Sequence, residues 1–243
     1  MPQNRIAGIA EPTIAEVAAE FLADQRKRVG AGTFRNYQGI VDLFQRCLDR
    51  YAYEGLGKVE RKLFERLYEA EGDAHREFCQ IFGPERILPH VNYFLTFFII
   101  RKVIAPQGMI RAAGTVMKRL AAWLAEKGYV KADEARDAKD QGAAAARDLP
   151  RAEKLATLLQ TFADMQPRGD EDNEIEDHFA ITRVEPGKIW LDAMGESRRA
   201  KSIEVPELIG RLCTVGWSIS GVIGRVGGQW RLVEAWNVYP SGT

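Results

Sequence analysis

Residues that could perform catalysis are few in this chain, and they do not form a recognisable set. The three histidines share no metal-ligand spacing, and His75 with Cys79 supplies fewer ligands than a zinc site needs. Ser218 has no histidine near it in the sequence to act as a general base. The glycines from Gly221 to Gly228 match neither a P-loop nor a dinucleotide-binding fingerprint, because no Lys-Ser/Thr pair follows them. We therefore expect no active site, no metal and no cofactor.

Positively charged residues form a clearer pattern. The chain carries no net charge, yet the segment from Ile100 to Lys131 holds seven Lys/Arg residues against Glu126 alone, a local charge of +6. Arg111 and Lys118 are seven residues apart, so in a helix they share one face, and Arg119 is adjacent. Such a face could hold the phosphates of a DNA duplex by charge, with an affinity that falls as salt rises. A solvated helix face without a partner explains the same pattern equally well.

Two other cations complete the predicted contact set. Arg35 follows closely on Thr33, which is placed to cap a helix, and a phosphate could bind at such a helix N-terminus. Lys102 belongs to the basic segment described above. The residues predicted to contact double-stranded DNA are therefore Arg35, Lys102, Arg111, Lys118 and Arg119.

The N-terminal part of the chain must position these cations, and its apolar residues recur at helical spacing. Thr13 and Glu16 form a capping-box pair that predicts the start of the first helix. A second helix is expected to begin at Thr33, and a third to cover residues 58–70.

The later helices are marked by proline and glycine. A helix is expected between Pro106 and Gly128, where glycine can adopt the left-handed conformation that ends a helix. The charged, alanine-rich residues 131–147 predict a solvent-facing helix, which Pro150 interrupts. An amphipathic segment then continues through Phe162.

The period of the apolar residues changes after this segment. Pro186-Gly187 and Gly227-Gly228 are each flanked by strand-like segments, which predicts two β-hairpins. A short helix is expected between the hairpins, from Val205 to Cys213. Two hairpins are too weak to stand unless they close or pack, so we expect a small SH3-like or OB-like barrel. The local tryptophans are expected to supply its core: Trp190, Trp217, Trp230 and Trp236.

These patterns predict an α+β protein with two domains. A helical domain is expected over residues 1–165 and a small β domain over residues 178–243. Residues 166–177 hold six acids against Arg168 alone and predict an acidic linker. A composition of 46% hydrophobic and 28% charged residues is typical of folded chains and excludes a disordered one.

Nothing in the sequence predicts a membrane segment or an oxidising compartment. The most apolar stretch, Val91–Ile100, is about half the length of a membrane span. The three cysteines form no CxxC pair, and residues 1–20 lack the pattern of a signal peptide. We therefore expect a cytoplasmic protein without membrane contact.

The helical part resembles the core-binding domain of tyrosine recombinases and phage integrases, a SAM-like helical bundle that clamps one side of a DNA duplex. Residues 13–22, Gly32–Tyr37 and Phe44 are similar to its opening helix and its second helix of the type T-x-R-x-Y…F. Ile110–Val130 is similar to its last helix, although Gly108-Met109 replaces the threonine usual at its start. The resemblance covers about residues 10–165, with residues 56–85 as an insertion, and implies contact with DNA.

The resemblance does not extend to the recombinase catalytic domain. That domain uses a tyrosine nucleophile with an arginine and histidine phosphate clamp, and here a small β domain takes its place. Tyr239 could be compared with the nucleophile, but no histidine follows Phe179, so the His-x-x-Arg part of the clamp cannot form there. Tyr239 is therefore expected to be structural, covering one end of a barrel.

Two functions from different classes remain open on the sequence. The first is a non-enzymatic DNA-binding or DNA-associated protein, with the β domain as an accessory module. The alternative is a protein-interaction or scaffold module whose helical bundle has lost DNA binding, with a partner protein bound through the β domain. An enzyme would need a pocket of converging polar groups, which no motif indicates.

Overall fold

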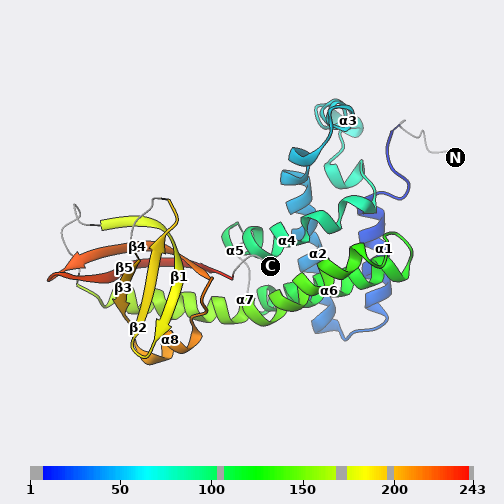
Figure 1. The fold of residues 1–243 in the computed structure, drawn as a ribbon. Coiled ribbons are helices and arrows are strands. Elements are labelled where there is room, and N and C mark those ends of the chain that lie inside the picture. The colour runs from blue at the N-terminus through cyan, green and yellow to red at the C-terminus, as the bar shows by residue number, and fades with distance from the viewer. Residues whose placement is uncertain (1–7, 103–106, 168–173, 196–199, 241–243) are drawn as a thin grey trace. The chain divides into compact units, whose positions relative to one another are not determined.

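The structure is a computed structural model that describes residues 8–102, 107–167, 174–195 and 200–240 (Figure 1). Its contacts divide the chain into two compact units. The helical unit comprises residues 1–99 and 103–146, and the sheet unit comprises residues 100–102 and 147–243. The protein is therefore of the α+β class, with helices first and a sheet after them.

Two helices open the helical unit, α1 (Ile14–Arg26) and α2 (Ala31–Tyr51). The predicted capping box of α1 is confirmed, because Glu16 N–H donates to Thr13 Oγ1 and Thr13 N–H donates to Glu16 Oε2. The predicted cap of α2 is wrong. Gly30 is the N-cap, Phe34 N–H already donates to its carbonyl, and Thr33 lies inside the first turn.

The third predicted helix is confirmed as α3 (Lys58–Tyr68). Short helical turns precede and follow it in the chain. Most of them are 3-10 turns, a conformation that occurs in short pieces and often connects longer helices. The Val91–Ile100 segment is an α-helix with a π-helical section, and its apolar face is buried. The bounds are η1 (Ala52–Gly55), η2 (Gly72–Ala74), η3 (Phe78–Gln80), η4 (Pro84–Arg86), η5 (Leu88–His90), α4 (Val91–Tyr93), η6 (Phe94–Phe98) and α5 (Ile99–Arg101).

The helix predicted between Pro106 and Gly128 is confirmed as α6 (Gln107–Glu126), and it is followed by α7 (Glu134–Asp164). The two helices cross at glycines. A Cβ atom added to Gly114 would lie 2.2 Å from Ala146 N, and one added to Gly142 would lie 2.6 Å from Lys118 N. The backbones therefore approach more closely than any side chain permits.

The predictions for α7 require two corrections. Residues 131–147 are not all solvent-facing, because Ala135, Ala138 and Gly142 are buried. Pro150 does not interrupt the helix, which continues to Asp164. A proline inside a helix costs a hydrogen bond, about 3 kcal/mol. Helical stability comes mainly from tertiary packing, and the part of α7 after Pro150 is packed against the sheet.

The sheet unit holds five antiparallel strands in the order β3-β2-β1-β4-β5. The sheet is open, with β3 and β5 as its edges, so the predicted barrel is not closed. Both predicted hairpins are confirmed, and Gly227 and Gly228 have φ values of 58° and 84° in the second turn. The bounds are β1 (Glu174–Glu185), β2 (Lys188–Ala193), β3 (Lys201–Glu204), α8 (Glu207–Leu212), β4 (Ser218–Val226) and β5 (Gln229–Tyr239).

The boundaries of the linker and of the β domain that the sequence predicts differ from the bounds of the sheet unit. Strand β3, which begins at Lys201, lies between the two predicted hairpins in the chain and is not predicted from the sequence. Strand β1 begins at Glu174, inside the segment predicted as a linker, while residues 168–173 of that segment lie outside the described residues. The C-terminal part of the unit also starts at Arg147, whereas the β domain was expected from residue 178, because the second half of α7 is part of its core.

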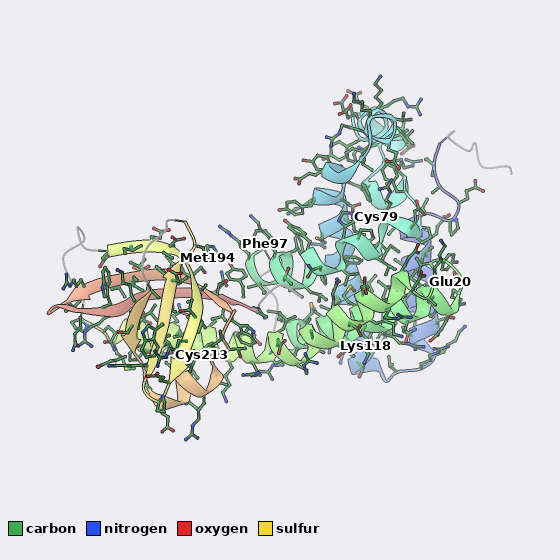
Figure 2. The ribbon with its side chains drawn as sticks, viewed as in Figure 1. Glu20, Cys79, Phe97, Lys118, Met194 and Cys213 are labelled. Carbon is green, nitrogen blue, oxygen red and sulfur yellow. The ribbon has the colours of Figure 1, made fainter. Side chains whose placement is uncertain are left out.

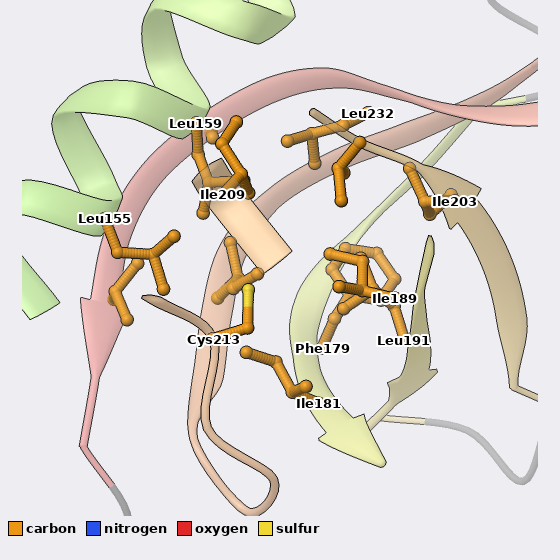
Figure 3. Close-up of a cluster of buried hydrophobic side chains, with 14 of the residues drawn as sticks. Leu155, Leu159, Phe179, Ile181, Ile189, Leu191, Ile203, Ile209, Cys213 and Leu232 are labelled. Atoms are coloured by element: carbon orange, nitrogen blue, oxygen red, sulfur yellow. The ribbon is translucent and has the colours of Figure 1, made fainter. Parts of the chain in front are cut away.

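The core of the sheet unit joins α7 to one face of the sheet (Figure 3). Leu155 and Leu159 of α7 are fully buried with Phe179, Ile189 and other strand residues. At about 25 cal/mol for each Å² of apolar surface, burying such a leucine contributes on the order of 2 kcal/mol. The prediction that the local tryptophans supply this core is only partly correct: Trp217 is buried, whereas Trp236 is 43% exposed.

Two further features bear on function. All three cysteines are free and buried, Cys47 and Cys79 in the helical unit and Cys213 in the sheet unit. Within the described ranges, none of the helices combines the length and the apolar character needed to cross a membrane.

Candidate nucleic-acid interface

Helix α6 positions most of the predicted contact residues. One side of the helix is buried, including Ala113, Met117, Leu120 and Leu124, so the opposite side faces solvent. The helix ends as predicted at Gly128, which has a φ of 78°, and Tyr129 N–H donates to Leu124 O over 2.9 Å. Because one side of α6 is buried, only the cations on the opposite side are exposed to a binding partner.

The solvent-facing side of α6 carries a ridge formed by Arg111, Thr115 and Lys118, which are all exposed. Figure 2 labels Lys118 on this helix. Arg111 and Lys118 are two turns apart, about 10 Å along the axis. The only acid on α6 is Glu126, which lies at its last position, so the α6 ridge itself carries no negative charge.

Arg119 lies beside the α6 ridge, about 100° around the helix from Lys118. Its guanidinium forms an ion pair with Glu126, with an Nη1–Oε1 distance of 3.3 Å. Burial raises the pKa of Tyr37 on α2, and the nearby charge of Arg119 opposes this rise. Arg119 is therefore paired with Glu126, and its charge acts on Tyr37 of α2.

Lys127, which belongs to the basic segment, is held in a network with α1. Its ammonium lies 2.8 Å from Glu20 Oε1 and 3.0 Å from Asp24 Oδ2. Tyr129 Oη donates to Glu20, and Trp123 Nε1–H donates to Asp24. The hydrogen bonds from Lys127 are the largest cause of the lowered pKa of both Glu20 and Asp24. Lys127 therefore connects the end of α6 to α1.

The remaining predicted residues, Arg35 and Lys102, do not belong to α6. Arg35 is exposed in the first turn of α2, two positions before the buried Tyr37. Residues two apart in a helix do not face each other, so Arg35 and Tyr37 lie on different sides of α2. Lys102 is exposed after α5 and belongs to the sheet unit. Only Arg111, Lys118 and Arg119 thus share one element.

A groove between α2 and α3 is a feature that the sequence reading missed. Its cavity has a volume of about 700 Å³. The rings of Tyr53 and Phe64 stack at 5.6 Å, and those of Phe64 and Tyr68 at 5.2 Å. Its lining residues combine three arginines, three acids and three aromatic residues: Arg46, Asp49, Arg50, Tyr53, Arg61, Phe64, Glu65, Tyr68 and Glu77.

Two arginines in this groove already have partners. Arg46 pairs with Asp42 at 3.0 Å, and Arg61 donates to the carbonyl oxygens of Tyr53 and Glu54. Arg50 is exposed and forms no ion pair with any of the described residues. Arg46 and Arg50 are four residues apart on α2, and this spacing was readable in the sequence. The junction of α2 with α3 was not readable, because the resemblance assigns residues 56–85 to an insertion.

The described residues show no activated nucleophile. Burial raises the pKa of the Cys47 and Cys213 thiols to about 12, and it raises that of Cys79 as well. Within the same residues, no group of three or more His, Cys, Asp or Glu could hold a metal ion. Tyr239, the last residue of β5, is 8% exposed and its ring lies 5.2 Å from that of His178.

The geometry therefore offers binding surfaces, namely the α6 ridge and the α2–α3 groove. Comparison with known proteins adds no further assignment: no family model, no curated protein and no solved structure matches this chain.

Proposed function

We propose that this protein binds double-stranded DNA without cleaving it, using the α6 ridge of its helical unit to contact phosphates. The observation that carries the proposal is the ridge itself. Arg111 and Lys118 stand two turns apart on an exposed helix side that carries no acid, with the small Thr115 between them.

The ridge suits a phosphate backbone for two reasons. Small side chains between the two cations allow a strand to approach the helix closely, and the hydroxyl of Thr115 can donate to a phosphate oxygen. Lys118 forms no ion pair with any described residue, so it can bind a phosphate without first losing a carboxylate. Arg119 would have to exchange Glu126 for a phosphate, and we place it at the margin of the contact.

The sheet unit adds a second argument. Its five-stranded open sheet supports an OB-like assignment rather than a closed SH3-like barrel. Strand β1 pairs with both β2 and β4 and has a bulge between Ile181 and Arg183, and α8 lies between β3 and β4 in the chain. OB-like units are partly open five-stranded barrels, many of which bind oligonucleotides. We infer that the sheet unit is an accessory module of this kind.

A gel-shift titration with plain duplex DNA tests the proposal. We expect wild-type protein to bind at about 50 mM salt and to lose affinity steeply as salt rises. Lys118→Glu should weaken binding about tenfold, uniformly across sequences, and reduce the salt dependence by about one phosphate contact. Lys154→Glu, which reverses an exposed charge on α7 within the sheet unit, is the matched control and should bind as the wild type does.

Two outcomes would overturn the proposal. The first is the absence of any shift at about 50 mM salt, where electrostatic binding is strong. The second is equal binding by Lys118→Glu and Lys154→Glu, because the position of the charge would then be irrelevant.

A second function, docking of another protein on the sheet unit, is supported by its exposed apolar residues. Met194 is 66% exposed, Leu208 is 54% exposed and Trp236 is 43% exposed. Tryptophan is enriched at protein interfaces. Failure of duplex binding, together with a protein complex that Trp236→Ala disrupts and Lys154→Glu does not, would favour this function over the first.

A further inference from the structure

The α2–α3 groove lies in the helical unit, where the C-terminal part of α2 meets α3 (Figure 1). Each helix contributes one face to it, because the lining residues recur three or four positions apart. The cavity volume of about 700 Å³ lies within the range of small-molecule sites in proteins. The wall from α2 and η1 carries Arg46, Asp49, Arg50 and Tyr53, and the wall from α3 carries Arg61, Phe64, Glu65 and Tyr68.

Three aromatic rings of the groove are stacked in a column. The planes of Tyr53 and Phe64 differ by 6°, and those of Phe64 and Tyr68 by 26°. Phe64, in the middle, is only 6% exposed, whereas Tyr68 is 46% exposed. The tyrosines therefore cover the phenylalanine and offer ring surface to the cavity, on which a planar ligand ring can stack.

Arg50 on α2 and Glu65 on α3 are the two charged side chains of this lining that have no partner among the described residues. Both are exposed, and they do not pair with each other across the groove. A ligand between the two walls can therefore meet one guanidinium and one carboxylate without first breaking an ion pair.

The other charged side chains of the lining are already engaged. Asp49 Oδ1 accepts from Cys79 N–H at 2.9 Å, and Glu77 Oε1 lies 3.5 Å from His75 Nε2. Arg61 and Arg46 have the partners given above. With three arginines and three acids, the lining has no net charge, which disfavours a ligand with several negative charges, such as a polyphosphate chain.

The complementary ligand thus carries a single anionic group, a planar ring and a hydrogen-bond donor. A guanidinium presents paired donors to a phosphate, and a carboxylate accepts from the exocyclic amino group of a nucleobase. Stacking of a base on an aromatic side chain supplies the third contact.

We propose that the α2–α3 groove binds a nucleoside monophosphate whose base carries an exocyclic amino group, either free or within a single strand of nucleic acid. Arg50 contacts the phosphate and Glu65 accepts from the amino group. The base stacks on the tyrosine rings of the column. This site is separate from the α6 ridge, and it adds a nucleotide to the ligands of the helical unit.

Calorimetric titration of the full chain at constant ionic strength tests the proposal with three ligands. They are adenosine monophosphate, inosine monophosphate, in which a carbonyl replaces the amino group, and a short single strand of deoxyadenosine nucleotides. We expect saturable binding of adenosine monophosphate and affinity about tenfold lower for inosine monophosphate, because its carbonyl oxygen would face the Glu65 carboxylate. The tighter of adenosine monophosphate and the single strand identifies the source of the nucleotide.

Two variants assign the contacts. Arg50→Gln should weaken binding of adenosine monophosphate about tenfold while the preference over inosine monophosphate remains. Glu65→Gln should abolish that preference, because an amide can both donate and accept. Arg66→Gln is the matched control, since Arg66 is an exposed arginine of α3 that does not line the cavity, and it should bind as the wild type does.

Three outcomes would overturn the proposal. The first is the absence of binding by adenosine monophosphate and by the single strand at nucleotide concentrations on the order of 10 mM. The second is equal affinity for the two monophosphates. The third is equal binding by Arg50→Gln and Arg66→Gln. Lys118→Glu should bind adenosine monophosphate as the wild type does, so this site and the duplex contact on the α6 ridge can each fail without the other.

Discussion

At the scale of single residues, carboxylates decide which cations are available to a partner. The basic segment contains seven Lys/Arg residues, but Lys127 is bound to Glu20 and Asp24, and Arg119 is bound to Glu126. The local charge of +6 is therefore larger than the positive charge that is available to bind a phosphate backbone. Lys118 remains exposed and has no ion pair among the described residues, which makes it the most informative position to change.

The Lys127 network predicts a pH-dependent contribution to stability. Lys127→Met should lower the Tm by an amount on the order of a few degrees at pH 7. The pKa values of Glu20 and Asp24 lie below their ordinary 4.5 and 3.8 in the folded protein. Their contribution is therefore present above those ordinary values and is lost as the pH falls through the lowered ones. The difference between wild type and variant should shrink below about pH 4.

Thermal denaturation followed by circular dichroism at a series of pH values checks this expectation. Lys131→Met is the matched control, because Lys131 is exposed and its side chain pairs with no described residue. A difference between Lys127→Met and wild type that stays constant from pH 7 to acid pH would contradict the assigned network.

Residue contacts were predictable only where they are local. The common face of Arg111 and Lys118 follows from their spacing of seven, and the same spacing joins Arg119 to Glu126. Lys127 and Glu20 are 107 positions apart, so no periodicity could pair them. Gln166, which accepts a hydrogen bond from Arg231, lies 65 positions before it, so this contact was not readable from the sequence either.

At the scale of elements, the crossing of α6 and α7 depends on two glycines. A Cβ atom at Gly142 would lie 2.6 Å from Lys118 N and 2.9 Å from Gly114 O, both of which are backbone atoms. Gly142→Ala should therefore destabilise the protein by about 1–3 kcal/mol, although alanine favours a helix more than glycine does. Chemical denaturation gives the free energy of unfolding that measures this loss.

Gly32→Ala provides the control for that variant. Gly32 lies in the first turn of α2, and an added Cβ atom would meet nothing within 4 Å. Without a clash, the substitution should stabilise the protein by up to about 1 kcal/mol. If both variants change the free energy of unfolding in the same direction, close packing does not explain why glycine occupies position 142.

Elements were predictable where the chain carries strong local signals. The capping box of α1, the glycine after α6 and the two hairpin turns all fix chain direction through a few neighbouring residues, and all are confirmed. Strand β3 carries a single buried apolar residue, Ile203, which is too short a pattern to detect. The path of α7 through Pro150 depends on packing against a sheet that lies later in the chain.

At the scale of the whole molecule, α7 contributes residues to both units. Its residues after Ala146 belong to the sheet unit, where Leu155 and Leu159 complete the core. A fragment of residues 147–243 should therefore fold and unfold cooperatively. A fragment of residues 166–243, cut at the boundary expected from the sequence, should not fold. Near-ultraviolet circular dichroism during heating distinguishes the two results, and a cooperative transition in the shorter fragment would show that α7 is dispensable.

The three buried cysteines have a practical consequence. With their thiol pKa values raised and their sulfur atoms inside the core, they should resist alkylating reagents while the native packing lasts. Cys213 reports on one unit, and Cys47 with Cys79 on the other. Each thiol becomes reactive only when its own surroundings open. Mass spectrometry after a brief pulse of alkylating reagent therefore shows the order in which the two units unfold, without a label engineered into the chain.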